Sequence, residues 1–200
     1  MAAETAHVTV SPRIEAHVVV GRVLRRFTAD EYERMGELGI LDEDERIELV
    51  DGKIITMAAV NVQHANCVGR LNKLLNRLAP EHVAIRVQDP VRLNDNCMPQ
   101  PDFLVIPGRE YTTLPRAADV LLLIEVSDSS LAYNRGEKLR MYAAAGIAEY
   151  WVADVNGQTV ERFAELRDGV YKRYDLAQRG DTLASLAVPE IIVSVAGIWK

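Results

Sequence analysis

The chain has 200 residues, of which 48% are hydrophobic and 26% are charged, and its formal net charge is −6. A chain of this length can bury roughly 70% of the surface that its unfolded form exposes, so a single hydrophobic core is expected. The acidic balance argues against binding of nucleic acid by a wholly basic surface, although it leaves a local basic groove open.

The sequence also indicates where the protein is located. No run approaches the ~20 apolar residues that a membrane-spanning helix needs. The N-terminus lacks the charged and apolar regions of a signal peptide. Cys67 and Cys97 match no metal-ligand spacing, and two thiols in a chain of this length indicate a reducing compartment. A cytoplasmic protein without a membrane partner is therefore expected.

The N-terminal part is expected to differ from the rest. Residues 1–26 alternate weakly and include Pro12, which predicts an arm that is either poorly ordered or paired with a sheet edge. Residues 27–200 are expected to form one domain, because no repeat or low-complexity segment divides them. This domain begins with a short helix, since Thr28 and Glu31 have the spacing of a capping box.

A hairpin and a long helix come next. Asp51-Gly52 favours the positive φ angles of a tight turn and predicts a hairpin over residues 46–57. Its alternation places Glu48 on the same face as apolar Val50. From Asn61 to Leu78, apolar residues recur every three or four positions, which predicts a helix lying on a sheet.

The rest of the chain is predicted to be mainly β-strand with one more helix. Short runs rich in Val, Ile and Leu are typical of buried strands. The predicted strands are 83–88, 90–95, 101–107, 121–130, 149–155, 159–166, 170–176 and 190–200. The helix is bounded by Asn134 and Gly146. This order of helices and strands predicts a fold that contains both, of the α/β class, in an α+β arrangement with a mixed sheet.

Two carboxylates stand at the ends of predicted strands. Asp102 precedes "FLVIP", and Glu125 lies six residues into an apolar run that starts at Val120. Burying a carboxylate without a partner is costly. Mg²⁺ is usually held by one or two protein carboxylates together with water and substrate phosphate, so two acids suffice in number. Acids at strand ends are also commonly solvated or structural, and the spacing alone fits both interpretations.

Three further polar residues favour a metal site. The hairpin register can bring Glu48 to the same rim, as a third acid or as a partner for a second ion. Lys138 lies on the helix that follows Glu125 and is suited to orient an attacking water or to offset phosphate charge. Gln88, at the end of a predicted strand, can hold a water or a carboxylate in place.

The amino-acid sequence around these residues resembles that of a known family. The segments "PQPDFLVIP" and "LLLIEVSDSSLAYNRGEKLRMYAAAGIAEYWVAD", preceded by "RIELVDGKI" and "RVQDPVRL", resemble the Uma-two group of restriction-endonuclease-like domains in the PD-(D/E)XK nuclease superfamily. The resemblance runs from about Phe27 to Asp154. It implies a restriction-endonuclease-like core of a central mixed β-sheet flanked by helices, Mg²⁺ as the cofactor with Mn²⁺ as a substitute, and hydrolysis of DNA phosphodiester bonds.

The resemblance also implies roles for individual residues. Asp102 and Glu125 would be metal ligands, and Glu48 corresponds to the N-terminal acid of the group. The superfamily has a lysine two residues after the glutamate, where this chain has Ser127. Lys138 matches the lysine that the group is thought to supply from the following helix.

The resemblance also allows a comparison with relatives at two more positions. Relatives often have a histidine where this chain has His64. A lone helical histidine is usually a surface or core polar residue, although histidine is also the commonest general base. Many relatives carry an aspartate where this chain has Asn134.

The leading hypothesis is a Mg²⁺-dependent DNA endonuclease. The alternative is a non-catalytic domain that shares the fold and binds nucleic acid or protein, which the acidic charge, Ser127 and Asn134 favour. An enzyme acting on another phosphate ester is a third option, because fold does not fix substrate. The apolar residues 190–200 and the N-terminal arm could cover sheet edges by pairing with a second copy, so a homodimer is expected.

Overall fold

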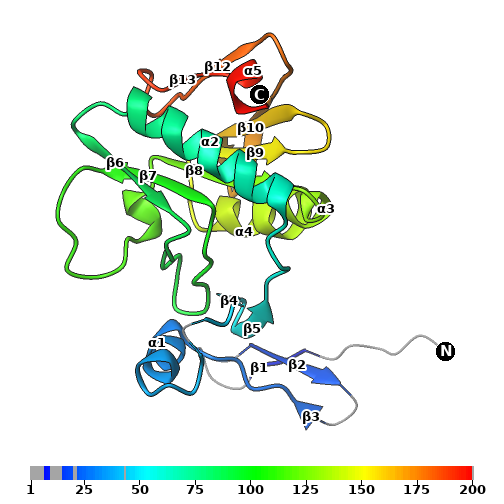
Figure 1. Ribbon diagram of the computed structural model, residues 1–200. Coiled ribbons are helices and arrows are strands. Elements are labelled where there is room, and N and C mark those ends of the chain that lie inside the picture. Colours follow the sequence, from blue (N-terminus) through cyan, green and yellow to red (C-terminus); the bar gives the residue numbers. More distant parts are fainter. Residues whose placement is uncertain (1–6, 10–14, 20–21, 43, 200) are drawn as a thin grey trace. The chain divides into compact units, whose positions relative to one another are not determined.

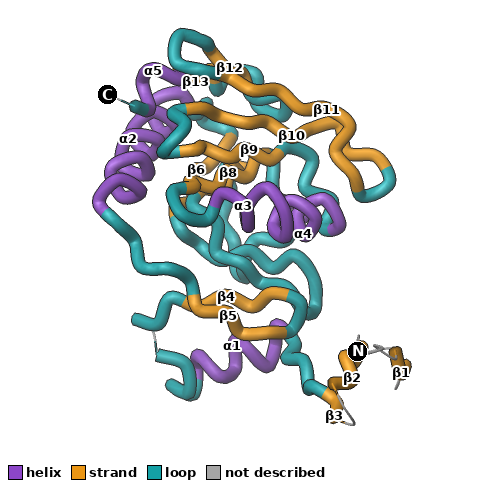
Figure 2. Tube along the Cα trace, turned by 90° about the vertical axis from the view of Figure 1, so that its right-hand side faces the viewer, coloured by secondary structure: helices purple, strands orange, loops and turns teal. Residues whose placement is uncertain are grey.

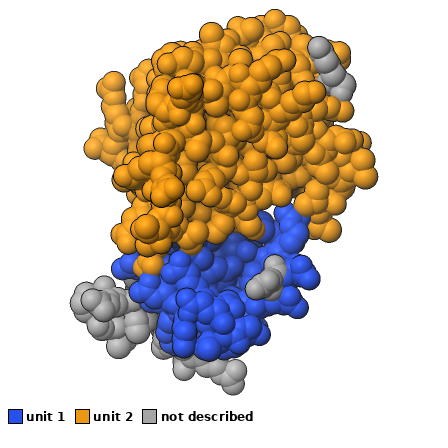
Figure 3. Space-filling view, turned by 60° about the vertical axis from the view of Figure 1, so that its left-hand side comes forward, with its two compact units in different colours: residues 1–58, 94–99 blue, residues 59–93, 100–200 orange. Residues whose placement is uncertain are grey.

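The computed structural model of the protein describes residues 7–9, 15–19, 22–42 and 44–199. The chain divides into two compact units, which Figure 3 shows in different colours. Unit 1 comprises Met1–Ala58 and Asn94–Pro99, and unit 2 comprises Ala59–Leu93 and Gln100–Lys200.

Unit 2 is built on a mixed β-sheet, as predicted (Figure 1). Its described strands have the order β11-β10-β9-β8-β7-β6. Neighbours are antiparallel except β8 and β9, which are parallel and joined by a helical crossover. The strands are β6 (Val83–Val87), β7 (Phe103–Pro107), β8 (Leu122–Ser127), β9 (Tyr150–Asp154), β10 (Thr159–Arg167) and β11 (Val170–Ala177).

Helices cover both faces of this sheet (Figures 1 and 2). One face packs against α2 (Val62–Leu78) and α5 (Val195–Ile198). The other packs against a helical segment made of α3 (Leu131–Tyr133), the π-helical turn η2 (Asn134–Lys138) and α4 (Leu139–Ala144). A short 3-10 helix, η1 (Ala117–Asp119), precedes β8. The predicted mixed sheet flanked by helices is confirmed.

Strand β8 shows how the sequence divides its side chains between the two helical layers. Successive side chains of a strand point to opposite faces. Ile124 and Val126 belong to the apolar core beneath α2. Glu125 and Ser127 instead contact the segment that contains η2 and α4. The one carboxylate in this buried strand therefore faces a layer that offers polar partners.

The long helix α2 follows the predicted pattern. Its N-cap Asn61 accepts a 2.9 Å hydrogen bond from the backbone N–H of His64. Cys67, Leu71 and Leu75 are buried on its inner face. The helix ends at Leu78, two residues before Pro80, which has no N–H to continue the helix.

Two strand predictions are wrong. Residues 90–95 form no strand within the described structure, and Arg92 and Asn94 make only isolated bridges. Pro90 has no N–H to donate to a ladder, and the Asn94 side chain accepts a hydrogen bond from the Asn96 backbone N–H, which starts a turn.

The second wrong prediction is a single strand over residues 190–200. Only β13 (Ile192–Ser194) is extended, and it pairs antiparallel with β12 (Thr182–Ala184) in a separate ribbon. The chain then turns into α5. Val195 and Ile198 are both buried there, and a spacing of three residues places them on one face of a helix.

Unit 1 contains the predicted short helix and hairpin. The capping box of Thr28 and Glu31 starts α1 (Ala29–Glu37). The hairpin is formed by β4 (Ile47–Val50) and β5 (Lys53–Thr56), and both turn residues between them have positive φ angles of 52° and 69°. Residues 94–99 belong to this unit because Met98 and Leu49 exchange backbone hydrogen bonds.

The arm predicted over residues 1–26 is described in part. Strands β1 (His7–Thr9), β2 (Glu15–Val19) and β3 (Arg22–Val23) pair antiparallel with one another. The rest of the arm up to residue 21 lies outside the described residues. The division into an arm and one domain over residues 27–200 stays a prediction. Within the described part of the chain, no helix has the length and apolar character needed to cross a bilayer.

Candidate active site

Asp102 and Glu125 stand opposite each other on neighbouring strands. The antiparallel register pairs Phe103 of β7 with Ile124 of β8. Asp102 immediately precedes Phe103 and Glu125 immediately follows Ile124, and the charge of Asp102 is near enough to raise the pKa of Glu125. Asp102 is 6% exposed and Glu125 is 4% exposed. The structure thus brings together the two carboxylates that the sequence singled out.

Three groups hold the Asp102 carboxylate. Its Oδ2 accepts a 2.8 Å hydrogen bond from the backbone N–H of Val126 and lies 3.2 Å from Nε2 of His64. Its Oδ1 accepts a 3.2 Å hydrogen bond from Nε2 of Gln88. Gln88 adopts a φ of 53°, a strained conformation for a residue with a side chain. Two of the supporting residues predicted from the sequence, His64 and Gln88, therefore contact the acid directly.

Two donors share one oxygen of Glu125. Oε1 accepts a 2.8 Å hydrogen bond from the Lys138 ammonium and a 2.6 Å hydrogen bond from the Tyr142 hydroxyl. Burial raises the pKa of Glu125, the positive charge of Lys138 opposes that rise, and the negative charge of Asp102 adds to it. Two carboxylates close together in a buried place favour a bound cation.

The π-helical turn positions the lysine. Asn134, Lys138 and Tyr142 follow one another at intervals of four residues, and all three reach toward strand β8. Such turns are rare and occur frequently at functional sites. The helical segment begins at Leu131, three residues before the predicted boundary, so this turn lies inside it.

Ser127 has a structural partner. Its buried hydroxyl accepts a 2.6 Å hydrogen bond from the side-chain amide of Asn134, which also lies 3.3 Å from the Ser130 hydroxyl. Because Asn134 begins the π-helical turn, this contact ties the helix to the end of β8. The helix thus delivers Lys138 to Glu125, while the superfamily's usual lysine position is occupied by a serine that anchors the same helix.

Tyr142 is the contact that the sequence interpretation missed. Tyr142, Tyr150 and Trp151 are all buried. A buried tyrosine hydroxyl usually has a polar partner, and the spacing of four residues between Lys138 and Tyr142 places both on one helix face. These two facts together could have indicated that Tyr142 reaches the same acid as Lys138.

The two cysteines are free and buried. Burial raises the pKa of the Cys67 thiol to about 12, and the nearby negative charge of Asp102 adds to this effect. Burial thus favours the neutral form of the Cys67 thiol.

Glu48 lies in unit 1. It is buried on β4, where it pairs with Ile55 of β5. Burial raises the pKa of Tyr32, and the charge of Glu48 raises it further. The role of Glu48 as a third acid of the site stays a prediction.

The donor set fits a hard divalent cation. Within the described residues, no group of three or more His, Cys, Asp and Glu gathers as a metal site. Asp102 and Glu125 supply carboxylate oxygens, which Mg²⁺ prefers, and it commonly needs no more than two protein carboxylates. Water and substrate oxygens would complete such a site.

A hollow of about 590 Å³ in unit 2 has its own polar contacts. Glu161 accepts hydrogen bonds of 2.6 Å from both Arg135 and Tyr174, and the bond to Glu161 together with burial raises the pKa of Tyr174 to about 12. The lining residues are Arg135, Asp154, Gly157, Thr159, Glu161, Phe163, Tyr174 and Leu176. The ionic groups of this hollow are thus engaged with one another.

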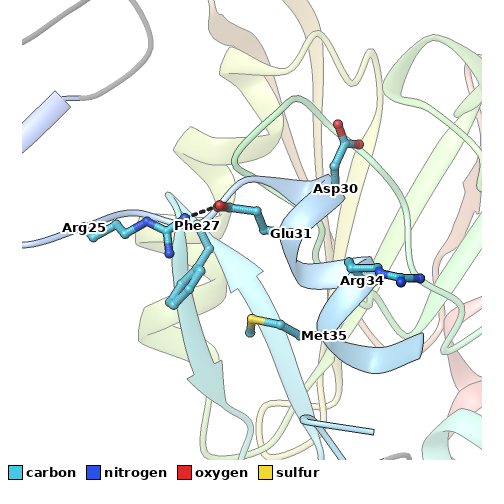
Figure 4. Close-up of a pocket in the computed structure, with 6 residues that line it drawn as sticks. All are labelled: Arg25, Phe27, Asp30, Glu31, Arg34 and Met35. Atoms are coloured by element: carbon cyan, nitrogen blue, oxygen red, sulfur yellow. Dashed lines mark hydrogen bonds and ion pairs between the residues drawn. The ribbon is translucent and has the colours of Figure 1, made fainter. Parts of the chain in front are cut away.

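Unit 1 has a second hollow, of about 410 Å³, beside α1 (Figure 4). Glu31 pairs with Arg25 there and also caps the helix. Arg34 pairs with Glu37. The charged groups of this hollow therefore stabilise the helix and its flank.

The fold and the sequence both have counterparts among known proteins. The chain is similar to a crystal structure described as a "putative nuclease belonging to DUF820" from Anabaena variabilis, with a TM-score of 0.67 and 14% sequence identity. The match covers 86% of this chain and 97% of that chain. Residues 29–196 match the model of the family Uma2, described as "Putative restriction endonuclease". The chain belongs to the Uma2 family, which confirms the resemblance found in the sequence. None of the curated proteins matches the chain.

Proposed function

We propose that this protein is a Mg²⁺-dependent endonuclease that hydrolyses phosphodiester bonds of DNA, with Mn²⁺ as a substitute ion. The observation that supports the proposal most is the pair of buried carboxylates, Asp102 and Glu125, aligned on neighbouring strands beside Lys138. Membership of the Uma2 family and the nuclease fold support the reaction class.

Each side chain of the site has a role in this proposal. Asp102 and Glu125 would hold the ion, with Glu48 as a third acid. A bound divalent ion supplies a water of lowered pKa and polarises a phosphoryl oxygen. Lys138 carries a positive charge that stabilises negative charge developing on the phosphate or orients the attacking water.

The supporting residues fix the geometry. Gln88 and His64 hold the two oxygens of Asp102 and so limit its rotation. Ser127 and Asn134 secure the helix that carries Lys138. Catalysis by positioned charges depends on this kind of fixed geometry.

Nicking of supercoiled plasmid DNA by the purified protein tests the proposal. Wild-type protein should nick DNA with Mg²⁺ or Mn²⁺, and Asp102→Asn and Glu125→Gln should reduce the rate by at least about 100-fold. Glu110→Gln removes an exposed carboxylate and should retain the wild-type rate. Equal rates for the wild type and the two site variants would overturn the proposal.

One observation favours the rival function, a non-catalytic domain that binds nucleic acid or protein. Ser127 replaces the superfamily's lysine and is engaged with Asn134. Calorimetric titration with Mg²⁺ and Mn²⁺ separates the two functions, because absence of binding at millimolar ion would favour the rival. A homodimer is also proposed, and light scattering on the purified protein measures it.

A further inference from the structure

Glu161 is a buried carboxylate on the same face of the sheet as Glu125. Only 4% of Glu161 is exposed. The register pairs Glu125 of β8 with Val152 of β9, and Val152 with Glu161 of β10. Neighbouring strands lie ~4.8 Å apart, so the backbones of the two glutamates are about 10 Å apart. Burying a carboxylate without a partner is costly, so the partners of Glu161 indicate why it is there.

Two side chains hold the Glu161 carboxylate. Its Oε2 accepts a 2.6 Å hydrogen bond from Nε of Arg135, and its Oε1 accepts a 2.6 Å hydrogen bond from the Tyr174 hydroxyl. The Arg135 guanidinium also lies 3.8 Å from Oδ2 of Asp154, at the end of β9. Arg135 is thus held by acids of two strands, and Tyr174 fixes the nearer acid from a third.

Arg135 belongs to the π-helical turn η2 that carries Lys138. The two cations are three residues apart in sequence. Lys138 donates a 2.8 Å hydrogen bond to Glu125, and Arg135 donates to Glu161. The same turn therefore offers one cation to each of two buried carboxylates that lie two strands apart.

This double pairing gives a physical reason for the π-helical turn. In an α-helix, side chains three residues apart lie on one face with ~5–6 Å between their Cβ atoms. The two glutamates are further apart than that. Hydrogen bonds of a π turn span five residues instead of four, so the turn is wider and spreads Arg135 and Lys138 around the helix. The bond between Arg135 and Glu161 therefore favours the π turn over an α turn.

Loss of Glu161 should change where Lys138 lies. A π turn contains one residue more than an α turn, and each residue of an α-helix turns it by about 100°. Conversion to an α turn would rotate Lys138 relative to Asn134, whose amide is bonded to Ser127. With Asn134 held in this way, Lys138 would point away from Glu125.

We propose that Glu161 is a positioning residue of the nuclease. It holds Arg135, keeps the π turn open and so places the Lys138 ammonium on Glu125. This inference rests on the proposed nuclease function and extends it to a residue two strands away from the proposed metal ligand. Because Lys138 acts on charge that develops during the reaction, its displacement should lower kcat and leave KM for DNA nearly unchanged.

Steady-state nicking of plasmid DNA with Mg²⁺ or Mn²⁺ tests this inference on the full chain. Glu161→Gln keeps the size of the side chain and removes the charge that holds Arg135. A misplacement of ~1 Å can cost about 100-fold, so kcat should fall at least about 10-fold while KM changes less than about 2-fold.

A milder variant covers the case in which Glu161→Gln does not fold. Tyr174→Phe removes one of the two hydrogen bonds to Glu161 at a residue that is 54% exposed, so the fold should tolerate it. Its kcat should fall by less than that of Glu161→Gln, again with KM nearly unchanged. Wild-type kcat in both variants would overturn the inference.

Asp175→Asn is the matched control. Asp175 of β11 accepts a 2.7 Å hydrogen bond from Arg162 of β10, so this change breaks another arginine–carboxylate pair that involves β10. Arg162 follows Glu161 directly and points to the opposite face of the sheet. Asp175→Asn should therefore keep the wild-type kcat. An equal fall of kcat in Asp175→Asn and Glu161→Gln would show a general effect of stability and would overturn the inference.

Urea denaturation tests the positioning without any cleavage. Lys138→Met, Glu161→Gln and the double variant form a cycle. If Glu161 holds Lys138 on Glu125, both single variants lose part of the same interaction. The double variant should then lose less free energy of unfolding than the two single losses added together. Additive losses would overturn the inference, because substitutions at independent sites add.

Failure of the inference differs from failure of the proposed function. If the wild type does not nick DNA but the cycle is non-additive, only the proposed function falls. If the wild type nicks DNA and the cycle is additive, only the inference about Glu161 falls.

Discussion

The ammonium nitrogen of Lys138 lies 2.8 Å from Oε1 of Glu125, and about 95% of each side chain is buried. Burial of two charges is costly, and their attraction often does no more than offset that cost. Such a pair is weak evidence for stability. It indicates instead that a carboxylate is required at this buried position, where the charge of Lys138 opposes the rise in the pKa of Glu125 that burial causes.

Removal of one partner should therefore destabilise the protein. Lys138→Met leaves Glu125 buried without its cation, and the free energy of unfolding at pH 7 should fall by about 3 kcal/mol. The double variant Glu125→Gln/Lys138→Met should recover most of this loss, because neither charge is buried. Urea denaturation of the three proteins measures both effects.

The effect of Lys138→Met should depend on pH. Burial already raises the pKa of Glu125, and loss of Lys138 raises it further. An acid whose pKa is higher in the folded than in the unfolded protein stabilises the fold at low pH, where the acid is protonated. This contribution to the free energy of unfolding is lost as the pH rises through the folded pKa. The destabilisation should thus shrink when urea denaturation is repeated at acidic pH. An unchanged difference between pH 7 and acidic pH would contradict the assignment.

Tyr142→Phe should separate positioning from packing. The change removes only the hydroxyl that holds Glu125 Oε1, so the free energy of unfolding should fall by about 1 kcal/mol. Plasmid nicking should slow by a larger factor than this small loss of stability explains. Tyr150→Phe removes an equally buried hydroxyl that donates to the Asn134 carbonyl and serves as the matched control. Equal nicking rates for Tyr142→Phe and Tyr150→Phe would count against a positioning role.

Local signals in the sequence predicted much of the fold. The capping box of Thr28 and the positive φ angles of Asp51-Gly52 depend on neighbours within a few residues, and both are present. The apolar runs of β7 and β8 also predicted two buried strands with Asp102 and Glu125 near their ends, and the two strands are neighbours in the sheet. These features depend on short-range chemistry, which the sequence displays directly.

Other features depend on contacts between distant segments. The apolar run 190–200 fits a strand as well as a short helix, and packing of Val195 and Ile198 into the core decides for the helix. The π-helical turn exists because Asn134 and Lys138 both reach β8, seven and thirteen residues away in sequence from Ser127 and Glu125. No short sequence pattern displays such a contact.

The strained backbone at Gln88 allows a test that leaves packing nearly unchanged. Gln88→Gly keeps the φ of 53° without strain but removes the hydrogen bond to Asp102. The two effects oppose each other, so the free energy of unfolding should stay within about 1 kcal/mol of the wild type. The nicking rate should fall. Gln158→Gly, at an exposed residue with a φ of 51°, gives the same backbone change outside the site and should nick normally.

Gly157 and Gly69 should respond in opposite directions to alanine. A Cβ at Gly157 would lie 2.6 Å from Oδ2 of Asp154, whose other oxygen accepts hydrogen bonds from the backbone N–H groups of Asn156 and Gly157. The carboxylate cannot move without weakening these bonds, so Gly157→Ala should lower the free energy of unfolding by about 1–2 kcal/mol. At Gly69 nothing lies within 4 Å, and Gly69→Ala should raise it by about 1 kcal/mol. Chemical denaturation measures both, and a loss of stability in Gly69→Ala would show that the fold itself requires this glycine.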